Sequence, residues 1–121
     1  MALKPETQEQ IKLFQWIRLH PKIKNCSFSI PNDGKRSKIM GNIMKRMGMR
    51  SGVSDIFIAY PNGIYNGLFI EMKAKDSLTG EYRKPTPSQL EFITEMNKMG
   101  YKALVCNGAD EAIQVIEKYL F

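Results

Sequence analysis

Two acidic residues and a lysine stand beside apolar runs in an arrangement that suits hydrolysis of a phosphate ester. Asp55 immediately precedes one apolar run, and Glu71 and Lys73 lie within the next run along the chain. Successive strand residues point to opposite faces, so Glu71 and Lys73 are expected side by side on one face. If the two runs pair as a hairpin, Asp55 also lies near Glu71.

Two carboxylates held this close repel each other, and the cost is about 4 kcal/mol at ~4 Å and an effective dielectric near 20. A divalent cation removes that cost, and oxygen ligands favour Mg²⁺ or Mn²⁺ over zinc. Such an ion keeps several waters and acidifies one of them. Lys73 would orient or deprotonate the attacking water, or neutralise charge on the phosphate, and the sequence does not choose among these roles. The competing interpretation is an ordinary set of ion pairs at strand ends.

The elements that must position these residues follow from the apolar pattern. Residues 56–60 and 67–75 are strand candidates separated by turn-forming Pro, Asn and Gly residues, which predicts a hairpin. Thr7 with Gln10, and Thr86 with Gln89, fit capping boxes at helix starts. The expected helices cover residues 7–20, 37–47, 87–99 and 110–120, and the expected strands cover 26–30, 56–60, 67–75 and 101–105. This order predicts an α/β fold with a small mixed sheet flanked by helices, in one domain over residues 1–121.

Composition narrows the classes of function. The chain is 43% hydrophobic and 25% charged, as in ordinary soluble proteins. No apolar run approaches the ~20 residues of a membrane span, and the polar N-terminus does not resemble a secretory signal. One histidine and two distant cysteines exclude sites built from several such ligands, and they suit a reducing, cytoplasmic location.

The charge distribution points to a polyanionic partner. Residues 1–50 hold eleven Lys or Arg against three Asp or Glu, whereas residues 51–121 hold seven against nine. A basic first half beside a mildly acidic second half is typical of proteins that hold nucleic acid with one part of the surface.

The motifs taken together resemble a known nuclease superfamily. The segments Gly52-Val53-Ser54-Asp55-Ile56 and Phe69-Ile70-Glu71-Met72-Lys73 look like the PD-(D/E)xK, or restriction-endonuclease-like, core. Further landmarks look like its VRR-NUC branch: Gln8-Glu9, the turn at 31–34, the Gly-rich loop at 48–55, and Thr86-Pro87-Ser88-Gln89 followed by Phe92. Ser54 departs from the family, which usually has proline there. With no second domain, the chain resembles the small stand-alone forms of bacteria and phages.

The resemblance implies a role for each matching residue. Asp55, Glu71 and the backbone carbonyl of Met72 would bind Mg²⁺ or Mn²⁺, and Lys73 would act on the water or on the transition-state charge. Glu9 would contribute to metal binding from the first helix, directly or through a coordinated water. The alternative interpretation of Glu9 is an ordinary acid in the first helical turn, where the helix dipole favours negative charge. Gln89 would position Lys73 or a phosphate while also serving as a capping residue.

The resemblance also implies a DNA endonuclease that cuts phosphodiester bonds, with branched DNA or a Holliday junction as substrate and a homodimer as the acting form. The basic residues of the first half would contact phosphates, which favours recognition of backbone and shape over sequence. The main alternative is an accessory module that binds DNA without useful catalysis, and a structural protein is a third reading. The expected DNA-binding residues are Lys35, Arg36, Lys38, Lys45, Arg46 and Arg50.

Overall fold

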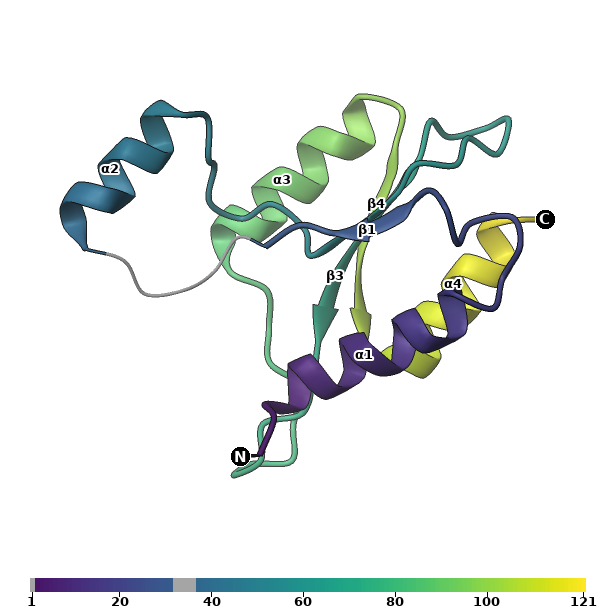
Figure 1. Ribbon diagram of the computed structural model, residues 1–121, viewed down its shortest axis with the longest axis horizontal. Coiled ribbons are helices and arrows are strands. Elements are labelled where there is room, and N and C mark those ends of the chain that lie inside the picture. The colour runs from purple at the N-terminus through teal and green to yellow at the C-terminus, as the bar shows by residue number, and fades with distance from the viewer. Residues whose placement is uncertain (1, 32–36) are drawn as a thin grey trace.

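A four-stranded mixed sheet lies at the centre of the computed structural model, which describes residues 2–31 and 37–121 (Figure 1). The strand order is β1-β2-β3-β4; β1, β2 and β3 are antiparallel, and β4 runs parallel to β3. The elements in chain order are α1 (Pro5–Ile17), β1 (Ser27–Ser29), α2 (Lys38–Arg46), β2 (Ile56–Ile58), β3 (Leu68–Lys73), α3 (Pro87–Lys98), β4 (Lys102–Asn107) and α4 (Ala109–Tyr119). The predicted α/β fold with a small mixed sheet is confirmed.

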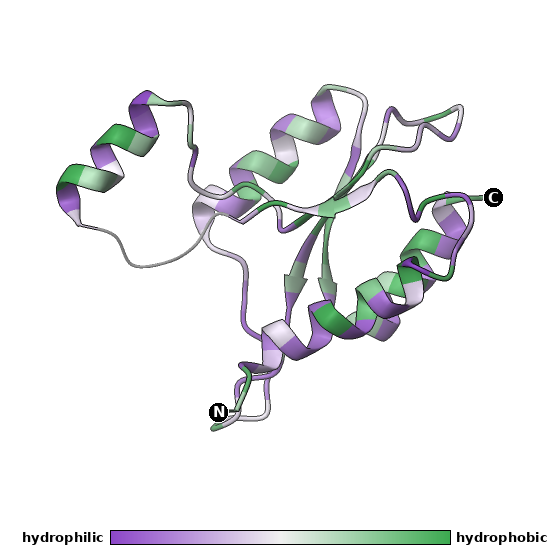
Figure 2. Ribbon diagram, viewed as in Figure 1, coloured by the Kyte–Doolittle hydropathy of each residue, from purple (hydrophilic) through white to green (hydrophobic). Residues whose placement is uncertain are grey.

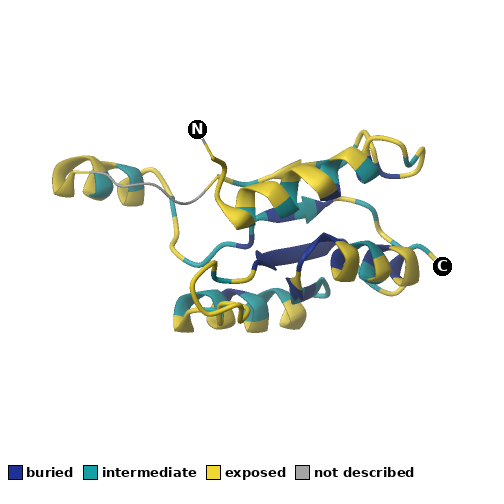
Figure 3. Cartoon of the chain, turned by 90° about the horizontal axis from the view of Figure 1, so that it is seen from below, coloured by how far each residue is buried: buried dark blue, intermediate teal, exposed yellow. Residues whose placement is uncertain are grey.

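Helices cover both faces of the sheet, and the side chains of β3, which point alternately to the two faces, are therefore buried on both. Leu68, Ile70 and Met72 of β3 are fully buried in the core that α1 and α4 complete. Phe69, on the opposite face, packs against Phe92 of α3 with ring centroids 5.3 Å apart. In Figure 3 the buried strands therefore lie between helices whose exposed sides form the surface. β3 is apolar along most of its length because both of its faces are covered.

The first helix begins earlier than the sequence suggested. α1 starts at Pro5 with Lys4 as its N-cap, and no side chain caps it, so the capping box expected from Thr7 and Gln10 is wrong. Proline suits the first turn of a helix because its missing N–H would have no intrahelical partner there. This shift places Glu6 in the first helical turn, which matters for the site described below.

The third helix agrees with its sequence signal. The Thr86 hydroxyl accepts a hydrogen bond from the backbone N–H of Gln89, and the Gln89 side chain accepts one from the N–H of Thr86 at 2.8 Å. This reciprocal capping box fixes the N-terminus of α3 beside the loop that leads into β2.

The second helix stands apart from the sheet in both views (Figures 1 and 3). Ser37 caps the start of this helix, which agrees with the helix predicted over residues 37–47. None of the residues of α2 is buried. Ile39, Met40 and Ile43 of this helix are exposed, and green bands on the ribbon in Figure 2 mark its hydrophobic residues.

Two further expectations concern the cysteines and membranes. Cys26 and Cys106 are both free thiols, and Cys106 is buried. None of the described helices combines the length and apolar character that a bilayer span requires.

Candidate active site

The hairpin formed by β2 and β3 brings the two predicted carboxylates together. Ile56 lies opposite Ile70 in the antiparallel register, so Asp55 and Glu71 are the next opposed pair. The backbone N–H of Met72 donates a hydrogen bond to the Asp55 Oδ2 atom at 2.8 Å. This bond ties the residue before β2 to the end of β3, and it holds the Asp55 carboxylate beside Glu71.

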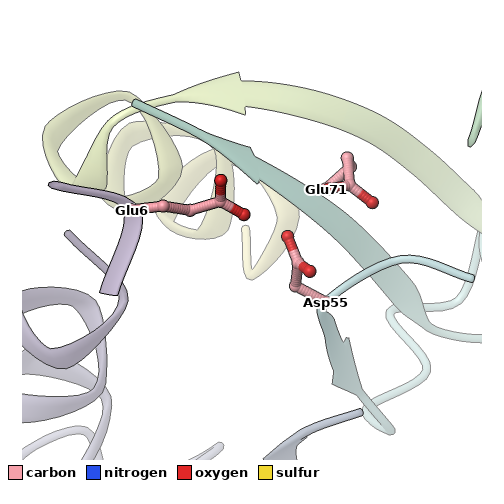
Figure 4. Close-up of side chains that lie close together, drawn as sticks. All are labelled: Glu6, Asp55 and Glu71. Atoms are coloured by element: carbon pink, nitrogen blue, oxygen red, sulfur yellow. The ribbon is translucent and has the colours of Figure 1, made fainter. Parts of the chain in front are cut away.

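A third carboxylate joins this pair from the first helix. Figure 4 shows Glu6 on α1 extending its side chain toward Asp55 and Glu71. One ligand oxygen from each of these three residues lies within 4.8 Å of the other two. Three hard oxygen donors at such spacing are the kind of set that Mg²⁺ or Mn²⁺ prefers.

Glu9, the acid of this helix that was predicted to join the site, lies at the start of α4 instead. The Glu9 carboxylate accepts a hydrogen bond from the backbone N–H of Ala109 at 2.8 Å, at the first residue of α4. A negative charge is favourable there, because the N-terminus of a helix carries positive partial charge. The structure thus brings Glu6, rather than Glu9, to Asp55 and Glu71. The signal available in the sequence was Pro5, which marks the helix start and places Glu6 one residue later.

Glu71 lies in an environment that disfavours its negative charge. Its side chain is 1% exposed, and its Oε1 atom has no hydrogen-bond partner within the described residues. Burial, followed by the hydrogen bond and the charge of Asp55, raises the pKa of Glu71 to about 9, although the Lys73 charge acts in the opposite direction. A buried acceptor without a partner is costly unless a cation or donor satisfies it.

Lys73 lies beside Glu71 on the same face of β3, as the strand alternation predicted. Its Nζ atom is 3.8 Å from the Glu71 Oε2 atom, and the residue is 7% exposed. The site therefore combines a nearly buried ammonium with three clustered carboxylates. Such an arrangement can hold a divalent cation and also place a positive charge near a phosphate.

The glycine-rich loop packs against the start of α3. A Cβ atom added at Gly52 would lie 2.3 Å from the backbone oxygen of Ser88, and Gly52 also has a φ of +85°. Only glycine allows so close an approach in this backbone conformation. The loop thereby sets the position of Asp55, while Gln89 of the adjacent α3 cap has its side-chain oxygen bound to the N–H of Thr86.

The basic residues expected to bind DNA fall outside the carboxylate group. Lys38, Lys45 and Arg46 are exposed on α2, and Arg50 is exposed on the loop that follows. The Arg50 guanidinium lies 6.0 Å from the centroid of the Phe92 ring. Lys35 and Arg36 lie outside the described residues.

Comparison with known proteins agrees with this architecture. The family model for the VRR-NUC domain matches residues 4–110. A solved structure titled "VRR_NUC domain protein" superposes with a TM-score of 0.81 at 27% sequence identity, over 99% of this chain and 91% of that one. No curated protein matches the sequence. Because the family model spans both the carboxylate group and Lys73, the chain belongs to the VRR-NUC family, whose domains are of nuclease type and act on DNA.

Proposed function

We propose that the chain is a divalent-metal-dependent endonuclease that hydrolyses phosphodiester bonds in DNA, with residues 1–121 acting as one catalytic domain. The observation that carries the proposal is the group formed by Glu6, Asp55 and Glu71, whose ligand oxygens lie within 4.8 Å of one another. These acids belong to a chain with a net charge of +6, which suits a polyanionic substrate.

The donor set fits a hard divalent cation. Glu6, Asp55 and Glu71 would hold Mg²⁺ or Mn²⁺, and the buried Oε1 atom of Glu71, which has no partner among the described groups, would gain one. The ion would also offset the mutual repulsion of the three carboxylates. Once bound, it would lower the pKa of water and stabilise negative charge on the phosphate.

Met72 supports the site through its backbone. Its N–H donates to Asp55, and in an antiparallel pair the N–H and C=O of one residue point toward the same neighbouring strand. The Met72 carbonyl is therefore directed to the side on which Asp55 lies, which supports its role as an additional ligand. The Met72 side chain is fully buried in the core and has no part in the chemistry.

Lys73 and Gln89 complete the proposed machinery. The Lys73 ammonium, 3.8 Å from Glu71, would orient the attacking water or stabilise charge on the phosphate in the transition state. Gln89 uses its side-chain oxygen in the α3 cap, which leaves its NH₂ group as the donor for a phosphate. A capping role and a positioning role for Gln89 are compatible for this reason. Glu9, bonded to Ala109, would act by fixing α1 against α4.

The exposed cations of α2 and its following loop would bind duplex phosphates. Lys38, Lys45, Arg46 and Arg50 lie on a helix and loop outside the sheet, where a wide ligand has access. We extend the proposal to branched DNA as the preferred substrate and to a homodimer as the acting form. The exposed apolar side chains of α2 support pairing, because large exposed apolar patches mark contact surfaces.

Cleavage assays on labelled DNA test the proposed function. Purified protein is incubated with duplex, nicked, forked and four-way DNA in Mg²⁺, in Mn²⁺ or in EDTA. We expect cleavage of at least one branched or nicked substrate with either metal and none in EDTA. Absence of cleavage from the whole panel in both metals would reject the endonuclease and favour a module that only binds DNA.

A further inference from the structure

Two successive backbone N–H groups at the turn from β4 into α4 connect α1 to the end of β3. The N–H of Gly108 donates a hydrogen bond to the Lys73 carbonyl at 2.9 Å. The next N–H, of Ala109, donates to the Glu9 Oε1 atom at 2.8 Å. One short piece of backbone therefore lies between the Glu9 carboxylate and the residue that carries the proposed catalytic ammonium.

The Glu9 carboxylate serves as the cap that α4 lacks. The N-cap residue of α4 is Gly108, which has no side chain to accept a hydrogen bond from the first helical turn. A carboxylate at a helix N-terminus accepts a charge-assisted hydrogen bond and interacts favourably with the helix dipole. Because Glu9 belongs to α1, the position of the first residue of α4 depends on a side chain from another helix.

Gly108 is packed closely against this carboxylate. A Cβ atom added at Gly108 would lie 3.0 Å from the Glu9 Oε1 atom and 3.5 Å from the Tyr82 hydroxyl, and the φ of Gly108 is +88°. Glycine suits both this backbone conformation and the close approach of the two side chains. Removal of the Glu9 carboxylate would therefore open space beside the turn as well as break its hydrogen bond.

The turn bears on catalysis because Lys73 is the last residue of β3. Lys73 lies opposite Asn107 at the end of the β3–β4 register, and its carbonyl accepts the Gly108 N–H. Its ammonium is nearly buried and lies 3.8 Å from the Glu71 Oε2 atom. A displacement of about 1 Å can reduce the rate of an enzymatic reaction by a factor of ~10². Movement of the turn would shift the Lys73 backbone and with it the ammonium.

We propose that Glu9 is a positioning residue for Lys73, which it holds in place through the turn at Gly108 and Ala109. The inference rests on the proposed function, in which the Lys73 ammonium acts on the attacking water or on the phosphate. The Glu9 carboxylate itself is bonded at the start of α4 and contributes no oxygen to the carboxylate group of the described residues.

Four single variants separate this role from general effects on the fold. Glu9→Ala removes the acceptor, whereas Glu9→Gln keeps a side-chain oxygen that can accept from Ala109. Lys12→Ala is the control for helix docking, because Lys12 pairs with Asp110 at 3.2 Å and so joins α1 to α4 without accepting from the turn. Ile116→Val is the control for stability, because it removes one methyl group from a fully buried side chain of α4.

Single-turnover cleavage in saturating Mg²⁺, measured over a range of protein concentrations, separates the rate of the reaction from DNA binding. We expect Glu9→Ala to lower the maximal rate roughly tenfold, while the half-saturating concentration and the Mn²⁺ affinity change less than about twofold. Glu9→Gln and both controls should retain at least about half of the wild-type rate. Equal losses in Glu9→Ala and a control, or the same loss in Glu9→Gln, would overturn the proposal.

A double-mutant cycle identifies the group through which Glu9 acts. In a Lys73→Ala background, Glu9→Ala should cause no further loss of the residual cleavage, because the group that Glu9 positions is absent. A further tenfold loss in this background would show that Glu9 acts independently of Lys73.

Amide hydrogen exchange of Gly108, followed by NMR in EDTA, tests the same link without cleavage. We expect the Gly108 amide to exchange roughly tenfold faster in Glu9→Ala and at nearly the wild-type rate in Glu9→Gln and Lys12→Ala. A protein that shows this pattern but cuts no DNA would reject the endonuclease and retain the link from Glu9 to the Lys73 backbone. Cleavage together with unchanged Gly108 exchange in Glu9→Ala would retain the endonuclease and overturn the positioning role.

Discussion

The Asp55 carboxylate accepts a hydrogen bond from the backbone N–H of Met72, a residue seventeen positions further along the chain. This bond holds the Asp55 side chain in one position beside the β2–β3 hairpin, where its carboxylate can bind a metal ion. The same carboxylate lies in the group formed with Glu6 and Glu71 (Figure 4). A carboxylate held by a backbone donor is preorganised, so little rotamer freedom remains to be lost on ion binding.

Glu6 and Glu9 form a matched pair for testing the metal site. Both are acids on α1, but only Glu6 contributes an oxygen to the carboxylate group. We expect Glu6→Ala to weaken Mn²⁺ binding roughly tenfold or more, since even residues that support a ligand typically contribute that much. Glu9→Ala should leave Mn²⁺ affinity nearly unchanged and lower the free energy of unfolding by about 1 kcal/mol, because it removes the α4 cap. Calorimetric titration with Mn²⁺ and thermal melting measure the two effects, and reversed results would assign the metal role to Glu9.

Glu71 should make the metal-free protein less stable as pH rises. In the folded chain its pKa is raised to about 9 by burial and by Asp55, whereas the unfolded value is near the ordinary 4.5. Between these values the unfolded state releases the proton and the folded state keeps it, so stability falls by at most about 1.4 kcal/mol per pH unit. We expect the melting temperature in EDTA to fall from pH 5 to 9, and to fall less in Glu71→Gln.

A metal-loaded sample supplies the control for this pH effect. Saturating Mg²⁺ at pH 8 should raise the melting temperature of the wild type more than that of Glu71→Gln, because ligands that bind only the folded state stabilise it. Identical pH profiles for the two proteins in EDTA would contradict the assigned environment of Glu71.

Sequence patterns predicted the part of the site that lies on the hairpin. Asp55, Glu71 and Lys73 could be placed together because strand alternation and antiparallel pairing are short-range rules. The contribution of α1 could not be placed in this way. One helical turn separates Glu6 from Glu9, and the choice between them depends on how α1 packs across the sheet and against α4.

The helices differ in the same way, because local hydrogen bonds can be predicted from the sequence and tertiary packing cannot. The α3 capping box was predicted because its donors and acceptors are local to Thr86 and Gln89. In contrast, α2 was predicted as a helix from Ile39, Ile43 and Met47, but periodicity could not tell that its apolar side would remain exposed.

Gly52 provides a test of how the loop positions the site. Gly52→Ala would place a Cβ atom 2.3 Å from the Ser88 backbone oxygen, and the loop or α3 would have to move. Gly48→Ala is the control, since Gly48 also has a positive φ, of +102°, but has nothing within 4 Å of the added atom. We expect Gly48→Ala to cost about 1 kcal/mol of stability from backbone strain.

We expect Gly52→Ala to cost at least 1 kcal/mol more than its control, because overpacking adds to the same strain. It should also weaken Mn²⁺ binding, since Asp55 follows the displaced loop. Denaturant unfolding and calorimetry measure both effects. If the two variants prove equally stable, close packing of the loop on α3 is not what holds Asp55.

The exposed apolar side of α2 predicts self-association. Ile39, Met47, Met40 and Ile43 are 75%, 80%, 48% and 40% exposed. We expect the solution mass at micromolar concentration to be twice the chain mass of 13.9 kDa. Ile39→Lys combined with Met47→Lys should return it to the chain mass, because burying two unpaired ammonium groups is unfavourable. Sedimentation of the wild type and of the double variant measures both masses. A monomeric wild type would contradict the proposed homodimer.

If the clustered acids and the adjacent ammonium cut DNA together, removal of the Lys73 ammonium should abolish most of the cleavage, and single-turnover kinetics of Lys73→Ala measures this loss. The wild type and the variant are compared in saturating Mg²⁺ on the same nicked or branched substrate, with Mn²⁺ titration establishing that both bind metal. We predict that the variant retains metal binding and loses cleavage by a factor of about 10²–10³, as expected for removal of a charge-stabilising group. Cleavage by Lys73→Ala at the rate of the wild type would show that the ammonium takes no part in the reaction.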